Sequence, residues 1–193
     1  VGPPGMFLMV TGSNMSGKST LLRALGTNVV LAQAGAPVCA EEFNLPPVLL
    51  ATSMRIHDSL SQGVSYYMAE LRRLKQIVDA ARAQQADSSR ILFYLLDEIL
   101  QGTNSAERQI AVRQVLTHLL AEGAIGAIST HDLELATVRP LSEVCHAVHF
   151  RETIHNESGR HEMTFDYKLR PGVATTTNAL KLLEIVGLAE KTE

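Results

Sequence analysis

The sequence is poor in cysteine and has no tryptophan. Its two cysteines, Cys39 and Cys145, lie far apart in 193 residues and in no metal-binding spacing. This excludes a small secreted domain held together by disulfides, and it excludes a cysteine-rich zinc site. We therefore expect two free thiols in a reducing compartment.

Long apolar runs are also missing. The longest, Phe7–Val10 and Ile91–Leu96, are far too short to span a bilayer, and no basic-then-apolar leader opens the chain. We expect no membrane partner and a cytoplasmic location. Because the chain begins at Val1 rather than at a methionine, we also expect residues 1–193 to be a single domain from a longer protein.

An excess of basic residues is the third absence. The formal net charge is −3, and acidic and basic residues are interspersed. A domain that binds DNA by itself normally carries surplus lysine and arginine to neutralise phosphates. If nucleic acid is a partner, we expect other regions of the parent protein to bind it.

The residues that are present alternate between buried strands and amphipathic helices. Continuous apolar runs predict strands at Phe7–Val10, Val48–Ala51, Ile91–Leu96 and Ile125–Ile128. Apolar residues at helical spacing predict helices over about 18–34, 65–86 and 106–122. Buried strands separated by helices predict an α/β fold with a mainly parallel sheet flanked by helices.

The C-terminal part predicts antiparallel strands at the edge of this sheet. Ala147–Phe150 and Met163–Leu169 alternate like a half-exposed antiparallel pair around a polar turn at Asn156–Gly159. A last short helix is expected through 183–186, and Gly187 would end it.

A glycine-rich segment between the first strand and the first helix matches G-x-x-x-x-G-K-[ST]. Its backbone amides and the start of the helix would cradle phosphates, Lys18 would reach the β- and γ-phosphates, and Ser19 would ligate Mg²⁺. An accidental glycine turn is rejected because the spacing, the lysine, the hydroxyl and both flanking elements would all have to coincide. The predicted nucleotide-binding residues are Gly12, Ser13, Asn14, Met15, Ser16, Gly17, Lys18, Ser19 and Thr20.

Polar residues follow the strands predicted at Ile91–Leu96 and Ile125–Ile128. Asp97 and Glu98 directly follow the first of these two, and we expect Asp97 to support Mg²⁺ and Glu98 to polarise the attacking water. His131 follows the other, and we expect it to contact the γ-phosphate and sense its loss. An acidic pair or a lone histidine is often structural, so both interpretations depend on the phosphate-binding motif in the same chain.

Gly63 and Ser65 stand just before the long amphipathic helix. They would place amides and a hydroxyl at its start, where an anion is favoured. Since the glycine-rich loop already provides one phosphate cradle, we expect this segment to meet a phosphate supplied by another subunit. Taken alone, it would be interpreted as a serine-rich helix cap.

Together these motifs resemble the ATPase domain of the MutS family, a branch of the ABC-type ATPases of DNA mismatch repair. The resemblance covers nearly the whole chain in order, and it is carried by Asn14-Met15, Ala40-Glu41-Glu42, Gly63-x-Ser65-x-Tyr67-x-x-Glu70, Asp97-Glu98, Gly102-Thr103 and Thr130-His131. It implies a P-loop NTPase fold, ATP hydrolysis with Mg²⁺, and a homodimer. Each nucleotide would lie between one subunit's P-loop and the partner's Gly63 and Ser65, with Tyr167 against the adenine. DNA would be bound by upstream domains.

The chain departs from the usual mismatch-repair pattern at four positions. Ser13 replaces a proline, Ser16 replaces a glycine, and Leu100-Gln101 replaces Gly-Arg, which resembles a bacterial MutS-like side branch. Rival functions are a transporter or chromosome-type ABC ATPase, a small-molecule kinase, and a module that binds ATP only to dimerise. The sequence leaves open whether the DNA partner is mismatched or branched.

Overall fold

The structure is a computed structural model that describes residues 3–54, 66–87, 89–157 and 160–174. Along the chain the elements are β1 (Phe7–Thr11), α1 (Lys18–Gln33), β2 (Val48–Ser53), α2 (Tyr66–Asp87), β3 (Ile91–Asp97), α3 (Ser105–Ala121), β4 (Ile125–Ser129), the 3-10 helix η2 (Leu133–Ala136), α4 (Leu141–Val144), β5 (Cys145–His149), β6 (Glu152–Glu157), β7 (Arg160–Phe165) and β8 (Arg170–Pro171). Within the described ranges, no helix has the length and apolar character needed to cross a membrane.

The central sheet has six strands in the order β2-β3-β4-β1-β5-β8. The pairs β2/β3, β3/β4, β4/β1 and β1/β5 are parallel, and β8 is antiparallel to β5 at the edge. The predicted mixed α/β fold, with a mainly parallel sheet and an antiparallel edge, is therefore confirmed.

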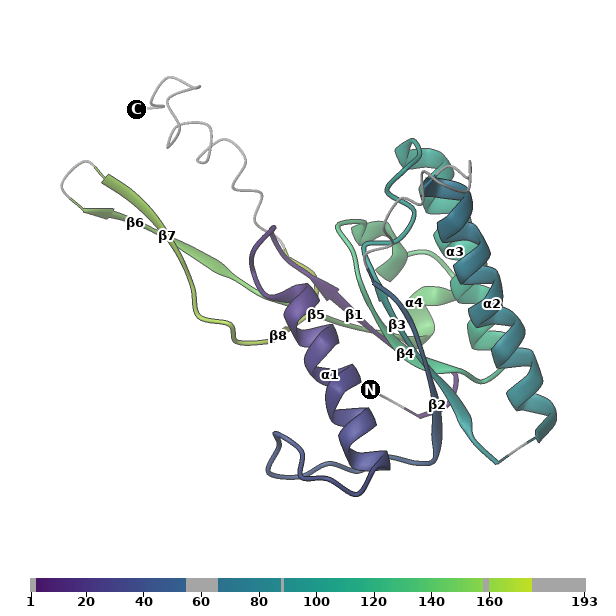
Figure 1. The fold of residues 1–193 in the computed structure, drawn as a ribbon. Coiled ribbons are helices and arrows are strands. Elements are labelled where there is room, and N and C mark those ends of the chain that lie inside the picture. The colour runs from purple at the N-terminus through teal and green to yellow at the C-terminus, as the bar shows by residue number, and fades with distance from the viewer. Residues whose placement is uncertain (1–2, 55–65, 88, 158–159, 175–193) are drawn as a thin grey trace.

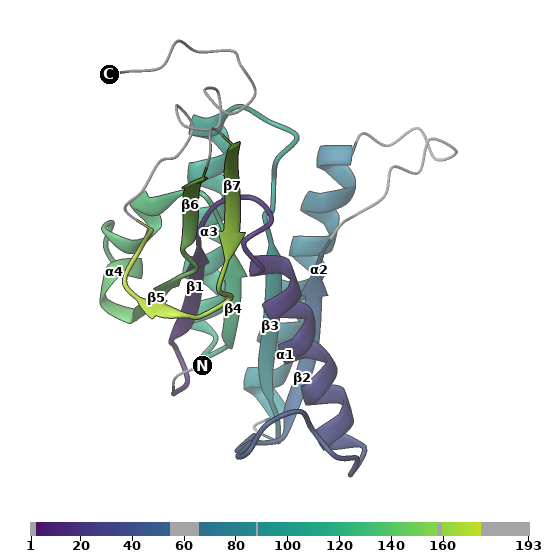
Figure 2. The same cartoon turned by 90° about the vertical axis from the view of Figure 1, so that its left-hand side faces the viewer.

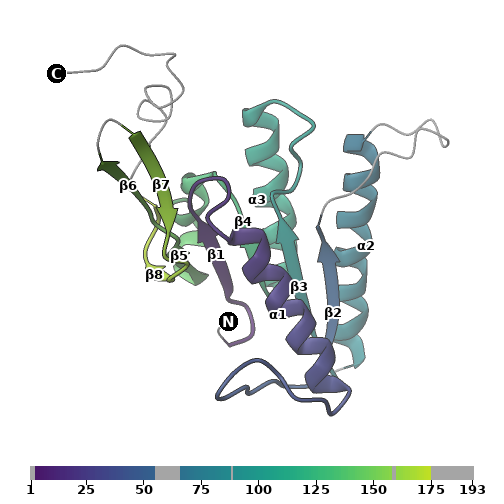
Figure 3. The ribbon, with the colours of Figure 1, turned by 60° about the vertical axis from the view of Figure 1, so that its left-hand side comes forward.

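Helices cover both faces of the sheet (Figure 1). α1 lies on one face, and α2 and α3 lie on the other (Figure 3). Successive side chains of β3 point to opposite faces of the sheet, because side chains alternate along a strand with a period of two. Tyr94 and Leu96 pack with α2 and α3, whereas Phe93 and Leu95 pack with α1. This double burial explains why β3 is a continuous apolar run in the sequence.

The predicted pairing at the C-terminal edge is wrong. Cys145–His149 does not pair with 163–169 but joins the main sheet parallel to β1. The antiparallel partner of β7 is β6, and the two form a separate hairpin (Figure 2). The alternating pattern identified strands in this part of the chain, but alternation does not specify which strand lies next to which. The expected helix at 183–186 lies outside the described residues.

The helix predicted from about residue 106 begins one residue earlier, at Ser105. Its start is fixed by Asn104, whose Oδ1 accepts the Glu107 N–H at 2.9 Å and so satisfies one of the free amides of the first turn. Glu107 in that turn also places a negative charge beside the positive end of the helix dipole.

Gly126 lies in the middle of β4 opposite Tyr94, which is fully buried. A Cβ at position 126 would lie 2.4 Å from both the Tyr94 carbonyl oxygen and its ring. We expect Gly126→Ala to lower the free energy of unfolding by about 1–3 kcal/mol, measured by urea denaturation, because the backbone cannot move aside.

Gly26→Ala in α1 is the matched control for this prediction. There the added Cβ meets only the flexible end of Leu95, at 2.9 Å. A helical Gly→Ala change also gains up to about 1 kcal/mol of helix propensity. Equal destabilisation by the two variants would contradict the proposed clash.

Candidate functional site

In the sheet β4 lies between β3 and β1, so the carboxyl ends of these three parallel strands lie side by side. Val10, one residue before the end of β1, and Asp97, the last residue of β3, both align with Ser129 of β4. The glycine-rich loop (residues 12–17), the acidic pair and the segment that leads to His131 therefore leave the sheet side by side. In doubly wound parallel sheets this edge is where ligands bind.

The glycine-rich loop needs glycine at its two ends. Gly12 has φ 137°, and a Cβ there would lie 2.9 Å from Ser16 Oγ and 3.1 Å from the Phe150 carbonyl oxygen. Gly17 has φ 105° and directly precedes α1. Among the described residues, no side chain caps the first turn of α1 and no acidic residue lies in it. The amides of that turn can therefore serve an anion.

Lys18 is held inside the loop. Its side chain is 4% exposed, and Nζ donates to the carbonyl oxygens of Gly12 at 3.1 Å and Ser13 at 2.9 Å. The same atom lies 3.4 Å from Glu98 Oε1. A buried ammonium held beside the loop amides is well placed to bind a polyanion.

Asp97 accepts hydrogen bonds from two hydroxyls. Ser19 Oγ donates to Asp97 Oδ1 at 3.0 Å, and Ser129 Oγ donates to the same oxygen. Adjacent hydroxyl and carboxylate oxygens suit a hard divalent cation. In the described ranges, no three His, Cys, Asp or Glu side chains gather into a complete cation site. A cation here would thus need further ligands from water or a bound anion, as Mg²⁺ at phosphates does.

The Glu98 carboxylate contacts three nitrogen groups. Its Oε1 is 3.1 Å from His131 Nε2 and also contacts Lys18, and its Oε2 accepts a hydrogen bond from Gln101 Nε2 at 3.0 Å. His131 Nε2 is in turn 3.1 Å from Asn14 Oδ1 of the glycine-rich loop. The three sequence-predicted motifs therefore form one hydrogen-bonded set, with the Glu98 carboxylate 28% exposed at its centre.

This set borders a cavity of about 430 Å³. The cavity is lined by Asn14, Met15, Gly17, Lys18, Ser19, Thr20, Arg23, Glu98 and Tyr167. A second hollow, of about 250 Å³, shares Gly17, Thr20 and Tyr167 with it and is also lined by Leu21, Ala24 and Phe150. A polar cavity next to a more apolar one can accept a ligand with a charged part and a flat apolar part.

Tyr167 borders both hollows. It has φ 54° and is 65% exposed, and its ring lies 6.0 Å from that of Phe165. The loop around it is closed by Arg170, which donates to Asp166 at 2.6 Å. This hydrogen bond keeps the pKa of the Asp166 carboxyl well below its usual value. The thiol of Cys145 lies outside this site, and burial raises its pKa to about 11.

Some lining residues were not predicted from the sequence. Arg23 follows Ser19 by four residues on α1, so helical spacing could have placed both on one face of the helix. Phe150 comes directly after a strand, but its approach to Gly12 depends on the position of β5 beside β1. The predicted Gly63 and Ser65 lie outside the described residues, so their role stays a prediction.

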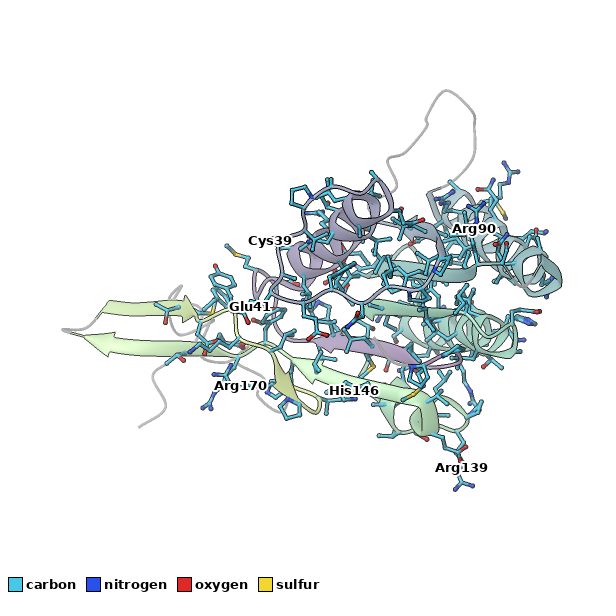
Figure 4. The ribbon with its side chains drawn as sticks, turned by 90° about the horizontal axis from the view of Figure 1, so that it is seen from below. Cys39, Glu41, Arg90, Arg139, His146 and Arg170 are labelled. Atoms are coloured by element: carbon cyan, nitrogen blue, oxygen red, sulfur yellow. The ribbon has the colours of Figure 1, made fainter. Side chains whose placement is uncertain are left out.

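The labelled basic side chains Arg90, Arg139 and Arg170 lie at separate places around the outline of the molecule (Figure 4). This distribution agrees with the interspersed charges of the sequence.

Comparison with known proteins gives consistent matches over the chain. The family model for MutS domain V matches residues 8–192. The DNA mismatch repair protein MSH6 of Arabidopsis thaliana is 33% identical over 190 residues, which are 95% of this chain and 14% of that protein. The DNA mismatch repair protein MutS of Streptococcus sanguinis is 32% identical over 95% of this chain and 20% of its own length. Endonuclease MutS2 of Thermus thermophilus is 30% identical over 95% of this chain and 23% of its own. The chain therefore spans only 14–23% of the length of these relatives.

Proposed function

Since the chain belongs to the MutS family through its domain V, we propose that it is a P-loop ATPase of the ABC type that hydrolyses ATP with Mg²⁺. The observation that supports this most directly is the convergence of Lys18, Asp97, Glu98 and His131 at the carboxyl edge of the sheet, where Lys18 and Glu98 line one cavity.

In this proposal the glycine-rich loop is the P-loop. Its amides and the Lys18 ammonium bind the β- and γ-phosphates. Ser19 and Asp97, whose oxygens already lie 3.0 Å apart, hold Mg²⁺. Mg²⁺ supplies neutralising charge for the phosphate oxygens.

Glu98 is the proposed general base. Phosphate that binds Lys18 competes with Glu98 for the ammonium and so frees the carboxylate for a water molecule. The water oxygen attacks the γ-phosphorus and its proton passes to Glu98. The bond to the bridging oxygen breaks to give ADP and phosphate. His131, 3.1 Å from Glu98, is placed to hydrogen-bond the γ-phosphate and register its loss.

The adjoining hollow and Tyr167 accept the adenine in this proposal. Gly63 and Ser65 of a second copy close the nucleotide from the other side, so that two nucleotides join a homodimer. The relatives named DNA mismatch repair proteins favour the same setting for this chain, in which nucleotide state would be coupled to mismatched or branched DNA bound by other regions.

The proposal is tested by measuring the release of phosphate from ATP and the mass of the protein in solution. We expect ATP hydrolysis that stops when Mg²⁺ is removed. We also expect the light-scattering mass of Glu98→Gln to double only with Mg²⁺ and ATP. Transfer of phosphate to an added acceptor rather than to water would favour a kinase instead. A mass that stays that of a monomer at saturating ATP would count against the composite site, and absence of any ATP binding would count against the proposal as a whole.

A further inference from the structure

A carboxyl group outside the proposed catalytic set is buried near it. Glu70 lies in the second turn of α2 and is only 3% exposed. One of its oxygens, Oε2, has no hydrogen-bond partner among the residues that the structure describes. Burial, which is the larger effect, raises the pKa of this carboxyl group, and the backbone N–H of Leu100, two residues after Glu98, lies close enough to lower it.

A buried carboxyl at this place is costly in itself. An apolar side chain could fill the same space between α2 and the sheet without losing the hydration of two oxygens. The neighbouring buried positions of α2, such as Leu74 and Ile77, are filled in that way. The carboxyl therefore has a use that packing alone does not explain.

The turn that Glu70 contacts has an unusual backbone. Glu98 and Leu100 both have positive φ, at 47° and 60°, although neither is glycine. The left-handed region costs an ordinary residue about 1–2 kcal/mol, so such a turn persists only where its surroundings enforce it. At one end the Glu98 N–H donates to the Ser129 carbonyl and hydroxyl oxygens, each at 3.1 Å. At the other end Leu100 is fully buried and its N–H lies beside the Glu70 carboxyl group.

We propose that Glu70 is a positioning residue for hydrolysis: by accepting the Leu100 amide it fixes the turn that aims the Glu98 carboxylate into the cavity. This rests on the proposed function of Glu98. Glu70 acts through Leu100 and touches neither nucleotide nor metal. Since α2 begins directly after the segment predicted to meet a partner's phosphate, Glu70 also joins the start of this helix to the hydrolytic carboxylate of its own subunit.

Two variants of Glu70 test the proposal. Glu70→Leu fills the space but accepts no hydrogen bond, so we expect kcat to fall about 10-fold or more while the ATP dissociation constant stays within about twofold. Its unfolding midpoint should not fall, because a buried carboxyl has been removed. Glu70→Gln keeps an oxygen for the Leu100 amide and should retain most of the wild-type kcat.

The matched control is Leu74→Val, one turn further along α2 at a position that is 1% exposed. It should lower the unfolding midpoint and leave kcat unchanged, which separates positioning from general loss of stability. Hydrogen exchange of the Leu100 amide, measured by NMR without nucleotide, gives a readout that needs no activity. It should be faster in Glu70→Leu than in the wild type and unchanged in Leu74→Val.

The outcomes separate this proposal from the proposed function. If the wild type does not hydrolyse ATP, the proposed function fails, and amide exchange still decides whether Glu70 holds the turn. If the wild type is active and Glu70→Leu keeps its kcat, the positioning role alone is overturned. The positioning role is also overturned if Glu70→Gln lowers kcat as much as Glu70→Leu does. It is overturned as well if the Leu100 amide exchanges at the same rate in Glu70→Leu as in the wild type.

Discussion

Replacement of Glu98 by glutamine is expected to slow ATP hydrolysis about 100-fold or more and to leave ATP binding intact. Glutamine has the same shape but accepts no proton from water. It also removes the negative charge 3.4 Å from Lys18 Nζ, and the ammonium remains held by the carbonyls of Gly12 and Ser13. The affinity for ATP should therefore stay equal to that of the wild type or increase.

Single-turnover hydrolysis and equilibrium binding of ATP are the two measurements for this variant. Glu143→Gln is the control, because Glu143 is an exposed carboxylate that pairs with Arg139 outside the site. It should behave as the wild type in both measurements. Unchanged turnover in Glu98→Gln would rule out Glu98 as the general base.

Removal of the Lys18 side chain, in Lys18→Ala, should weaken ATP binding about 100-fold or more. Hydrogen bonds to charged groups contribute roughly 1.5–3 kcal/mol each, and loss of two such bonds to phosphate exceeds the 2.8 kcal/mol or so that corresponds to 100-fold. Lys18→Arg should not restore binding, because the planar guanidinium does not fit a place that is 4% exposed and already bounded by the Gly12 and Ser13 carbonyls.

Calorimetric titration with ATP measures this effect, and circular dichroism shows whether the variant is folded. Lys75→Ala is the control, since Lys75 is 73% exposed on α2 and pairs only with Asp79 among the described residues. ATP affinity of Lys18→Ala within threefold of the wild type would contradict the phosphate-binding role of the loop.

The central strands could be predicted from the sequence almost to the residue. Phe7–Val10, Ile91–Leu96 and Ile125–Ile128 each end one residue later in the structure, at Thr11, Asp97 and Ser129. The prediction succeeded because strands buried on both faces are apolar throughout. Each predicted strand stopped one residue short because the last residue of the strand is polar. Two of these residues, Asp97 and Ser129, belong to the site, whereas the Thr11 hydroxyl bonds the Val148 carbonyl oxygen. The partners of β5, β6 and β7 could not be predicted, since neighbours in a sheet are fixed by tertiary packing.

The glycine-rich loop, the acidic pair and His131 were predicted as separate motifs, and the structure brings these three to one edge of the sheet. The fourth predicted motif, Gly63 and Ser65, lies outside the described residues. What the sequence did not reveal are the contacts between the three motifs at the edge. Because β4 lies between β1 and β3, His131 can hydrogen-bond Asn14. For the same reason the Ser129 hydroxyl can donate to Asp97 and accept from the Glu98 amide. Glu70 was visible in a family motif, but its burial against Leu100 depends on how α2 packs on the sheet.

The position of β1 has a consequence for the synthesis of this protein. β1 and the glycine-rich loop are made before the other strands of this sheet. Both neighbours of β1 in the sheet, β4 and β5, are made only when translation has passed Ile125 and reached His149. Until then β1 has two unpaired edges and an apolar sequence, which is a hazard for aggregation. A chain that stops before Ile125 is therefore expected to be a client of chaperones and proteases, without a partly working site.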